Sequence, residues 1–300
     1  GELLWFQDYY VVKELVFGVA INRQTRNVTV IFRGTITPND WSHNLDASLI
    51  TLDNPIEEDY EGKAPTIQLH RGFQNYLLRK RLDTNRSWVD RICDLVIDYG
   101  DRLLGGDYQV VATGHSLGGA LATIFGFYVS VDQRVNQKDP VTIYSFASPM
   151  LGDHSFADAF RHQESHGRIR HARIHNGVDV VAHVPFNVKV SKRGSTFCHV
   201  GMGIMLRWLP TRVYSPYRYL NWPRRPHFEY ASRVGFWASL RKAWRNNSLF
   251  NVAPLKIKEY HHLNEYEKRV RYALSLEENE MCKLSLEELY ERFCSECQIG

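Results

Sequence analysis

The chain has 300 residues, of which 44% are hydrophobic and 23% charged, and its formal net charge is +4. This length allows one large α/β domain with a sizeable core, and the composition excludes a disordered or collagen-like chain. No run of about 18 apolar residues is present, so we expect no membrane-spanning helix but a soluble or peripherally bound protein. The N-terminal segment is acidic and lacks a basic cluster, which is not the pattern of a signal peptide.

The first hundred residues predict a hairpin, a long loop and two helices. Alternating β-branched residues at 16–22 and 27–33 are typical of paired strands. An irregular stretch rich in Pro, Asn and acidic residues follows at 36–66, and a loop of this length is usually functional, so it is the candidate lid. Helical periodicity then predicts helices over 70–82 and 87–104.

The next segments alternate between strand and helix patterns. Apolar runs at 108–113, 141–147 and 168–175 predict buried strands, and residues 120–131 and 153–163 predict helices between them. This order predicts a mostly parallel central sheet flanked by helices on both faces.

The composition changes near residue 200. Residues 201–250 contain nine Arg or Lys, a single acidic residue and eleven aromatic residues. We interpret residues 186–255 as a basic aromatic insertion, followed by a helix over 255–275 and a helical tail over 275–300. Because no linker separates these parts, one domain covering the whole chain is expected.

The tail predicts two helix starts and no metal site. Its LSLEE segments at 274–278 and 284–288 each contain a Ser-x-x-Glu capping box. Cys294 and Cys297 form a lone CxxC, and with only Cys282 nearby the four ligands of a zinc site are missing. The odd total of five cysteines is not a disulfide framework, so we expect neither a metal nor a cofactor.

A nucleophile motif lies between the strand pattern at 108–113 and the helix pattern at 120–131. The segment Gly114–Gly118, GHSLG, fits G-x-S-x-G and places Ser116 at its centre. A sharp strand-to-helix turn exposes such a serine to a base and to a substrate carbonyl, and small flanking residues permit the strained backbone. The motif therefore predicts Ser116 as the nucleophile of acyl transfer.

In a fold with this elbow the acid and then the histidine follow the serine along the chain. Asp179 directly follows the strand pattern at 168–175 and is the first choice for the acid, with Asp153 as the alternative. Spacing alone does not choose between the last two of the four histidines beyond residue 185, which are His199, His227, His261 and His262.

The oxyanion hole needs one donor after the serine and one from a loop after an early strand. The first is the backbone N–H of Leu117. Thr35 follows the strand pattern at 27–33 and a glycine, so its backbone N–H is the predicted second donor and its hydroxyl a third.

Together these segments resemble the class 3, or fungal-type, triacylglycerol lipase family, which has the α/β-hydrolase fold. The matching segments are VIFRGT (30–35), Trp41, LHRGF (69–73), VVATGHSLGGALA (110–122), TIYSFASPMLGD (142–153) and NGVDVVAHVP (176–185). The family usually has Trp-x-x-Asp after the oxyanion loop, whereas Asn44 holds that place here. The gap from Asp179 to the base is also longer than usual.

The resemblance implies a triad of Ser116, Asp179 and a histidine, with Thr35 and Leu117 in the oxyanion hole. Many plant relatives show H-x-L/M-x-x-Y around the base. His261 fits that pattern, which ends at Tyr266, and is therefore preferred over His262.

The resulting hypothesis is a serine esterase that hydrolyses lipid esters such as triacylglycerols, glycerophospholipids or galactolipids. Arg, Trp and Tyr at 205–250 suit contact with a membrane or lipid droplet, although a structural cap explains the same residues. No nucleic-acid motif accompanies this basic segment, so no nucleic-acid partner is expected. The alternatives are a lipase-like binding or regulatory protein without enzymatic activity and an esterase of small, feruloyl-type esters.

Overall fold

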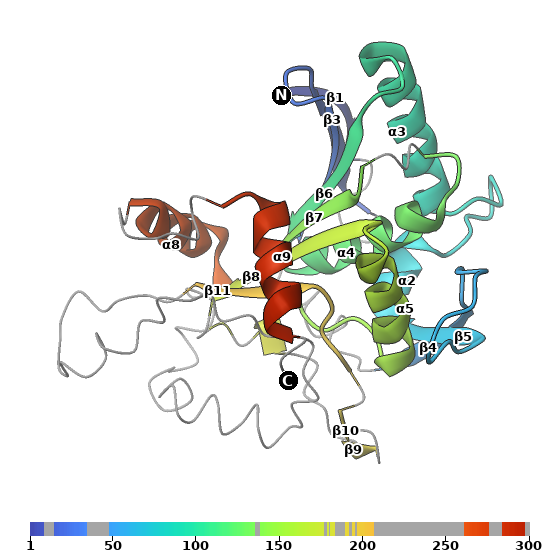
Figure 1. The fold of residues 1–300 in the computed structure, drawn as a ribbon. Coiled ribbons are helices and arrows are strands. Elements are labelled where there is room, and N and C mark those ends of the chain that lie inside the picture. Colours follow the sequence, from blue (N-terminus) through green and yellow to red (C-terminus); the bar gives the residue numbers. More distant parts are fainter. Residues whose placement is uncertain are drawn as a thin grey trace.

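A central sheet with helices on both faces forms the body of the protein in a computed structural model (Figure 1). The residues that the structure describes are 1–8, 15–34, 48–135, 139–176, 179, 181–183, 190–191, 194–195, 197–206, 261–275 and 284–297.

The central sheet has seven strands in the order β1-β2-β3-β6-β7-β8-β11. Their bounds are β1 (Glu2–Gln7), β2 (Phe17–Asn22), β3 (Asn27–Phe32), β6 (Gln109–His115), β7 (Val141–Phe146), β8 (Ile169–Asn176) and β11 (Met202–Leu206). The first three strands are antiparallel and the strands from β3 to β11 are parallel. The predicted α/β fold with a mostly parallel sheet is therefore confirmed.

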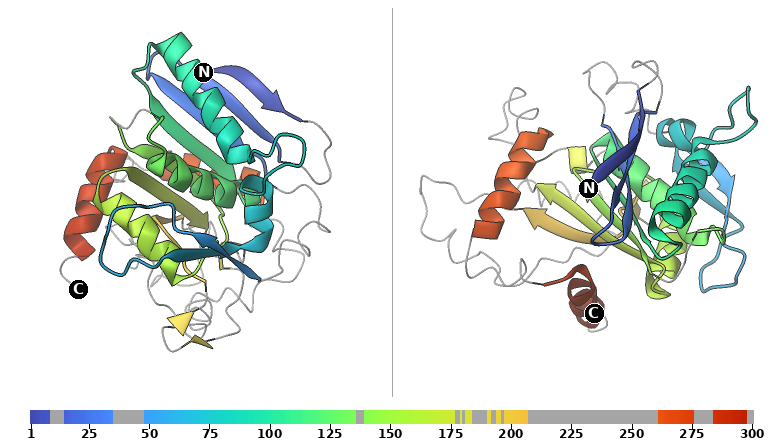
Figure 2. Two further views of the ribbon diagram at one scale, coloured as in Figure 1. Left: turned by 90° about the vertical axis from the view of Figure 1, so that its right-hand side faces the viewer. Right: turned by 90° about the horizontal axis from the view of Figure 1, so that it is seen from above.

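The helices divide between the two faces of this sheet (Figure 2). One face carries α2 (Arg71–Leu77), α3 (Trp88–Leu104), α4 (Leu117–Val131) and α5 (His154–Ser165). The other carries α8 (Leu263–Ser275) and α9 (Leu286–Cys297). The strand register explains the division: Ile143 lies opposite His171 and contacts α4, whereas Met202 lies opposite the next residue, Ala172, and packs against α9.

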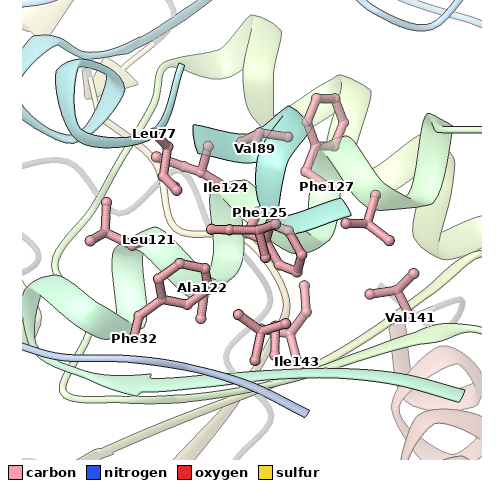
Figure 3. Close-up of a cluster of buried hydrophobic side chains, with 14 of the residues drawn as sticks. Phe32, Leu77, Val89, Leu121, Ala122, Ile124, Phe125, Phe127, Val141 and Ile143 are labelled. Atoms are coloured by element: carbon pink, nitrogen blue, oxygen red, sulfur yellow. The ribbon is translucent and has the colours of Figure 1, made fainter. Parts of the chain in front are cut away.

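The main core lies between the sheet and α4, nearly every residue of which is buried (Figure 3). Phe32 of β3 packs on Phe125 of α4 with 5.5 Å between ring centroids. Phe127 meets Phe156 of α5 edge to face at 5.1 Å. Such aromatic contacts fix how the helix sits on the strands, and therefore where its N-terminus lies.

The predicted loop over 36–66 is wrong in part. Residues of this stretch form β4 (Leu49–Asp53), which pairs with β5 (Thr66–His70) in a small antiparallel sheet. The first part of the candidate lid, residues 36–47, lies outside the described residues.

Other boundaries also differ from the sequence predictions. The helix predicted over 70–82 ends at Leu77, and β1 had not been predicted. The proposed insertion contains β9 (Val190–Ser191), β10 (Gly194–Ser195) and β11, and β11 is a strand of the central sheet. Residues 202–206 of the predicted insertion are therefore part of the central sheet.

The second capping box of the tail is confirmed. The Ser285 Oγ accepts the backbone N–H of Glu288, and the Glu288 carboxylate accepts the N–H of Ser285, where α9 begins. The first does not start a helix at its serine, because Ser275 is the last residue of α8. No helix within the described ranges is long and apolar enough to cross a membrane.

Candidate active site

Ser116 occupies a sharp turn between β6 and α4. Its φ of 59° and ψ of −124° lie in a region that residues other than glycine rarely adopt. Its backbone N–H donates to the carbonyl of Phe146 at the end of β7 at 2.9 Å. The strained backbone is therefore fixed to the neighbouring strand.

Two glycines allow this turn. A Cβ on Gly114 would lie 2.3 Å from the backbone of Gly118, and a Cβ on Gly118 would lie 2.2 Å from the carbonyl oxygen of Phe32. Both obstacles are backbone atoms that cannot move away cheaply. The spacing of glycines around the serine in the motif is thus a packing requirement.

Asp179 and His261 form a hydrogen-bonded pair, although 82 residues separate them in sequence. The His261 Nδ1 lies 2.8 Å from the Asp179 Oδ2. Beside a carboxylate this nitrogen carries the hydrogen, which leaves Nε2 as the basic nitrogen of a neutral ring. The Asp179 Oδ1 accepts the backbone N–H of Val181 at 2.9 Å, at the start of a short 3₁₀ helix over Val181–His183.

Tyr266 completes the surroundings of the acid. Its hydroxyl donates to the Asp179 Oδ2 at 2.7 Å and accepts the backbone N–H of Asn176 at 2.9 Å. Burial, followed by the charge of Asp179, raises the pKa of Tyr266 well above its usual value, so the hydroxyl keeps its hydrogen. The Asp179 carboxylate is thus held by Val181, His261 and Tyr266.

His115 links the serine turn to the Asp179–His261 pair. Its ring centroid lies 4.7 Å from that of His261 and 5.5 Å from that of Tyr266. Burial, and then the neighbouring His261, lowers the pKa of His115 to about 4. His115 is therefore neutral near pH 7 and adds no positive charge beside His261.

Of the two proposed oxyanion donors, Leu117 lies within the described residues. Leu117 is the first residue of α4, where backbone N–H groups have no partner within the helix and the helix dipole is positive. Thr35 lies outside the described residues. Its predecessor Gly34 packs on the turn, because a Cβ there would lie 2.7 Å from the carbonyl oxygen of His115 and 3.5 Å from the Cβ of Ser116.

The alternative candidates for the base and the acid do not join the Asp179–His261 pair in the described part of the chain. His262 is exposed, and its Nδ1 lies 3.4 Å from the backbone nitrogen of Asn264. The His199 Nε2 bonds the carbonyl of Ala182 at 2.7 Å. Asp153 caps the N-terminus of α5 by accepting the N–H of Phe156. Of the candidate acids and bases, the structure thus joins Asp179 to His261, while His227 lies outside the described residues.

No group of three or more His, Cys, Asp or Glu side chains in the described part of the chain could hold a metal ion. The side chains of Cys294 and Cys297, the other candidate ligands, lie outside that part.

A model of the family described as lipase (class 3) matches residues 29–189, a little over half of the chain. The chain belongs to the class 3 lipase family. Phospholipase A(1) DAD1, chloroplastic, from Arabidopsis thaliana is 31% identical over 190 residues, which are 63% of this chain and 40% of that protein. The galactolipase DONGLE, chloroplastic, from the same plant is 27% identical over 201 residues, 60% of this chain and 41% of that protein. The chain therefore spans about two fifths of the length of these curated relatives.

Solved lipase structures share the fold of this class 3 lipase chain. The Lip2 lipase of Yarrowia lipolytica matches with a TM-score of 0.51 and 21% identity, covering 69% of this chain and 66% of that one. At this identity the likeness concerns the fold.

The sequence motif includes Tyr266 but gives it no role, and the segments that contain Asn176 and His115 give these two residues none. The signal for Tyr266 is its fixed spacing from His261. The contact of its hydroxyl with Asp179 depends on how α8 packs at the end of β8, which local sequence does not encode.

Proposed function

We propose that this chain hydrolyses carboxylic esters of glycerolipids through an acyl-enzyme formed on Ser116. The observation that carries the proposal is the hydrogen-bonded Asp179–His261 pair, whose imidazole ring lies 4.7 Å from that of His115, the residue before the strained Ser116. Neither group is reactive alone, but together they supply a nucleophile and its base. Membership of the class 3 lipase family supports the same chemistry.

In the first half of the reaction, the Ser116 Oγ attacks the ester carbonyl and His261 accepts the hydroxyl proton at Nε2. Asp179 holds the ring by Nδ1 and stabilises the imidazolium that forms. The tetrahedral oxyanion binds to the backbone N–H groups of Leu117 and Thr35. The imidazolium then donates its proton to the leaving alcohol, and the acyl group stays on Ser116.

In the second half, water attacks the acyl-enzyme. His261 takes the proton from the water and returns it to the Ser116 oxygen as the fatty acid leaves. No metal or cofactor takes part in this scheme, since the serine is both nucleophile and leaving group.

Glycerolipids are the substrate class that the relatives favour, because their names are phospholipase A(1) and galactolipase. We infer that the chain meets such substrates at the surface of a membrane or droplet. The basic aromatic segment over 205–250 is one candidate for this contact, and nearly all of it lies outside the described residues.

The test is release of fatty acid from triacylglycerol, phosphatidylcholine and galactolipid dispersions by the wild type and by Ser116→Ala. We expect release from at least one of these lipids, with kcat lower in the variant by a factor on the order of 10⁶. His261→Ala should also lose activity. His262→Ala is its matched control, because His262 is exposed and should be dispensable for activity.

A folded wild-type protein that releases no fatty acid, ignores a short-chain soluble ester and does not react with a fluorophosphonate would contradict the proposal. That result would favour a binding or regulatory role. Hydrolysis of the soluble ester alone would instead favour an esterase of small substrates.

A further inference from the structure

A basic pocket lies at the loop between α2 and α3, which projects from the body of the fold (Figure 1). It is open, has a volume of about 340 Å³ and combines cationic with large apolar side chains. Its lining includes Leu15, Tyr76, Arg79, Lys80, Arg81 and Trp88. The guanidinium carbons of Arg81 and Arg91 lie 4.9 and 5.3 Å from the centroid of the Trp88 ring.

The charge of this region is unbalanced. Residues 75–91 contain five Arg or Lys and two Asp. The side chain of Arg81 pairs with Asp83, but Arg79 and Lys80 are exposed and make no ion pair within the described part of the chain. Two adjacent uncompensated cations beside an indole ring are suited to anionic groups at a lipid–water interface.

Leu82 lies in the same loop and is fully exposed, with a relative accessibility of 100%. Among the large hydrophobic side chains that the structure describes, the next most exposed is Leu3 at 58%. A bare leucine beside unpaired cations matches the layering of a membrane surface, where acyl chains lie below charged headgroups.

The pocket lies on the same edge of the sheet as Ser116. Leu15, which lines the pocket, precedes Val16, and the carbonyl of Val16 accepts the backbone N–H of Arg33 at 3.0 Å. The next residue, Gly34, packs against Ser116. A membrane that contacts the loop between α2 and α3 therefore lies at the edge of the sheet that carries Ser116.

We propose that the α2–α3 loop docks the chain on a membrane surface that carries anionic phospholipid headgroups. Arg79 and Lys80 bind headgroup phosphates, and Leu82 enters the region of the acyl chains. The inference rests on the proposed function and adds the charge of the surface and the residues that read it. Docking through this loop holds Ser116 near esters that lie just below the headgroups.

The test is co-sedimentation of Ser116→Ala protein, which leaves the lipids intact, with vesicles of phosphatidylcholine alone or mixed with phosphatidylglycerol. We expect binding to the anionic vesicles to fall about 25-fold when Arg79→Gln and Lys80→Gln are combined, because each cation near such a surface contributes about a factor of five. Leu82→Ser should weaken binding several-fold. Arg23→Gln with Arg102→Gln removes two exposed cations at the opposite edge and should change binding little.

Two outcomes would overturn the docking proposal. The first is wild-type binding that does not depend on phosphatidylglycerol. The second is an Arg79→Gln, Lys80→Gln protein that binds anionic vesicles as tightly as the control pair. Hydrolysis of a soluble ester, measured in parallel with Ser116 intact, should not change in the loop variants. If the wild type does not hydrolyse the soluble ester, that result counts against the proposed function. The vesicle measurements then still decide whether the loop docks on a membrane.

Discussion

At the scale of single residues, the site depends on groups that hold the reacting ones in place. Ser116 keeps a backbone conformation that costs on the order of 1 kcal/mol or more, and the hydrogen bond of its N–H to Phe146 helps to hold it there. Asp179 is fully buried and accepts from His261, Tyr266 and Val181. Loss of one of these donors should affect catalysis before it affects folding.

Tyr266→Phe tests this view. The variant removes the donor to Asp179, and a hydrogen bond to a charged group contributes about 1.5–3 kcal/mol. We expect kcat to fall about tenfold or more with little change in KM. Steady-state kinetics of the variant and the wild type would measure kcat and KM separately.

Tyr290→Phe is the matched control, since it also removes one buried tyrosine hydroxyl, but on α9. Its kcat and KM should stay close to the wild-type values. Equal losses of kcat in the two variants would mean that Tyr266 acts on overall stability and not on Asp179.

The proposed catalytic residues stand out in the sequence because each lies in a local pattern. Ser116 is centred in a glycine-spaced turn, and Asp179 follows a strand. Spacing left His261 and His262 open, because adjacent residues on one chain differ only in the direction of their side chains. Tertiary packing makes that choice, by burying His261 against Asp179 and leaving His262 exposed.

At the scale of elements, α4 is held to the sheet by close backbone contacts at one end and by side chains along its length. Gly118 lies on the backbone of Phe32 at its start. Gly126 lies on the side chain of Ile143 further along, where a Cβ would come within 2.4 Å of a terminal methyl carbon. A Cβ on Gly118 would thus meet rigid backbone, whereas a Cβ on Gly126 would meet a side chain that can move.

Gly118→Ala and Gly126→Ala should therefore differ, although each gains about 1 kcal/mol of helix propensity. We expect Gly118→Ala to lower the free energy of unfolding by about 3 kcal/mol or more, because a carbonyl oxygen of the sheet must move. Gly126→Ala should cost about 1 kcal/mol or less, since Ile143 can change rotamer. Urea unfolding of both proteins measures the difference, and equal losses would show that the contact at Phe32 is not rigid.

Helices and strands with a strong hydrophobic periodicity could be predicted from sequence. Strands that form only because a neighbouring strand pairs with them could not. The pattern of α3 is amphipathic along its whole length, and a capping box at Ser87 marks its start. By contrast, β11 is five residues long and directly precedes a basic aromatic segment, so the change in composition near residue 200 places it in the predicted insertion. It is a strand because the open edge of β8 pairs with it.

At the scale of the whole molecule, α9 is attached to the strand that leads to Asp179. The Tyr290 hydroxyl lies within hydrogen-bond distance of the Glu164 carboxylate, at 2.8 Å, and of the His171 carbonyl, at 2.7 Å. Arg170 of β8 also forms a bidentate ion pair with Glu287 of α9. The Arg170–Glu287 ion pair is partly exposed and contributes little to stability. The hydrogen bonds of the buried Tyr290 hydroxyl are therefore the stronger attachment of α9.

This network predicts a pH dependence of stability. Burial raises the pKa of Glu164 from 4.5 to about 7, against the opposing effects of Tyr290, Arg161 and Arg170. The folded state therefore binds this proton more tightly than the unfolded state does. Its stabilising contribution is complete below pH 4.5 and is lost as the pH rises to about 7. Glu164→Gln, which stays neutral, should become more stable relative to the wild type over that interval.

His171 must be separated from this effect, because burial lowers its pKa to about 3 and its contribution runs in the opposite direction over part of the same interval. The difference between wild type and Glu164→Gln cancels that contribution, since both proteins keep His171. Thermal unfolding at several pH values measures the difference, and a constant difference across the interval would refute the assignment to Glu164.

The distance along the chain between Ser116 and His261 has a consequence for biosynthesis. Translation produces the serine turn with β6 and α4 early, whereas the base and Tyr266 follow only after β11. Domains can begin to fold before synthesis is complete. A ribosome-bound chain that has folded as far as the serine turn still lacks His261, so under the proposed mechanism Ser116 has no base until residue 261 has emerged.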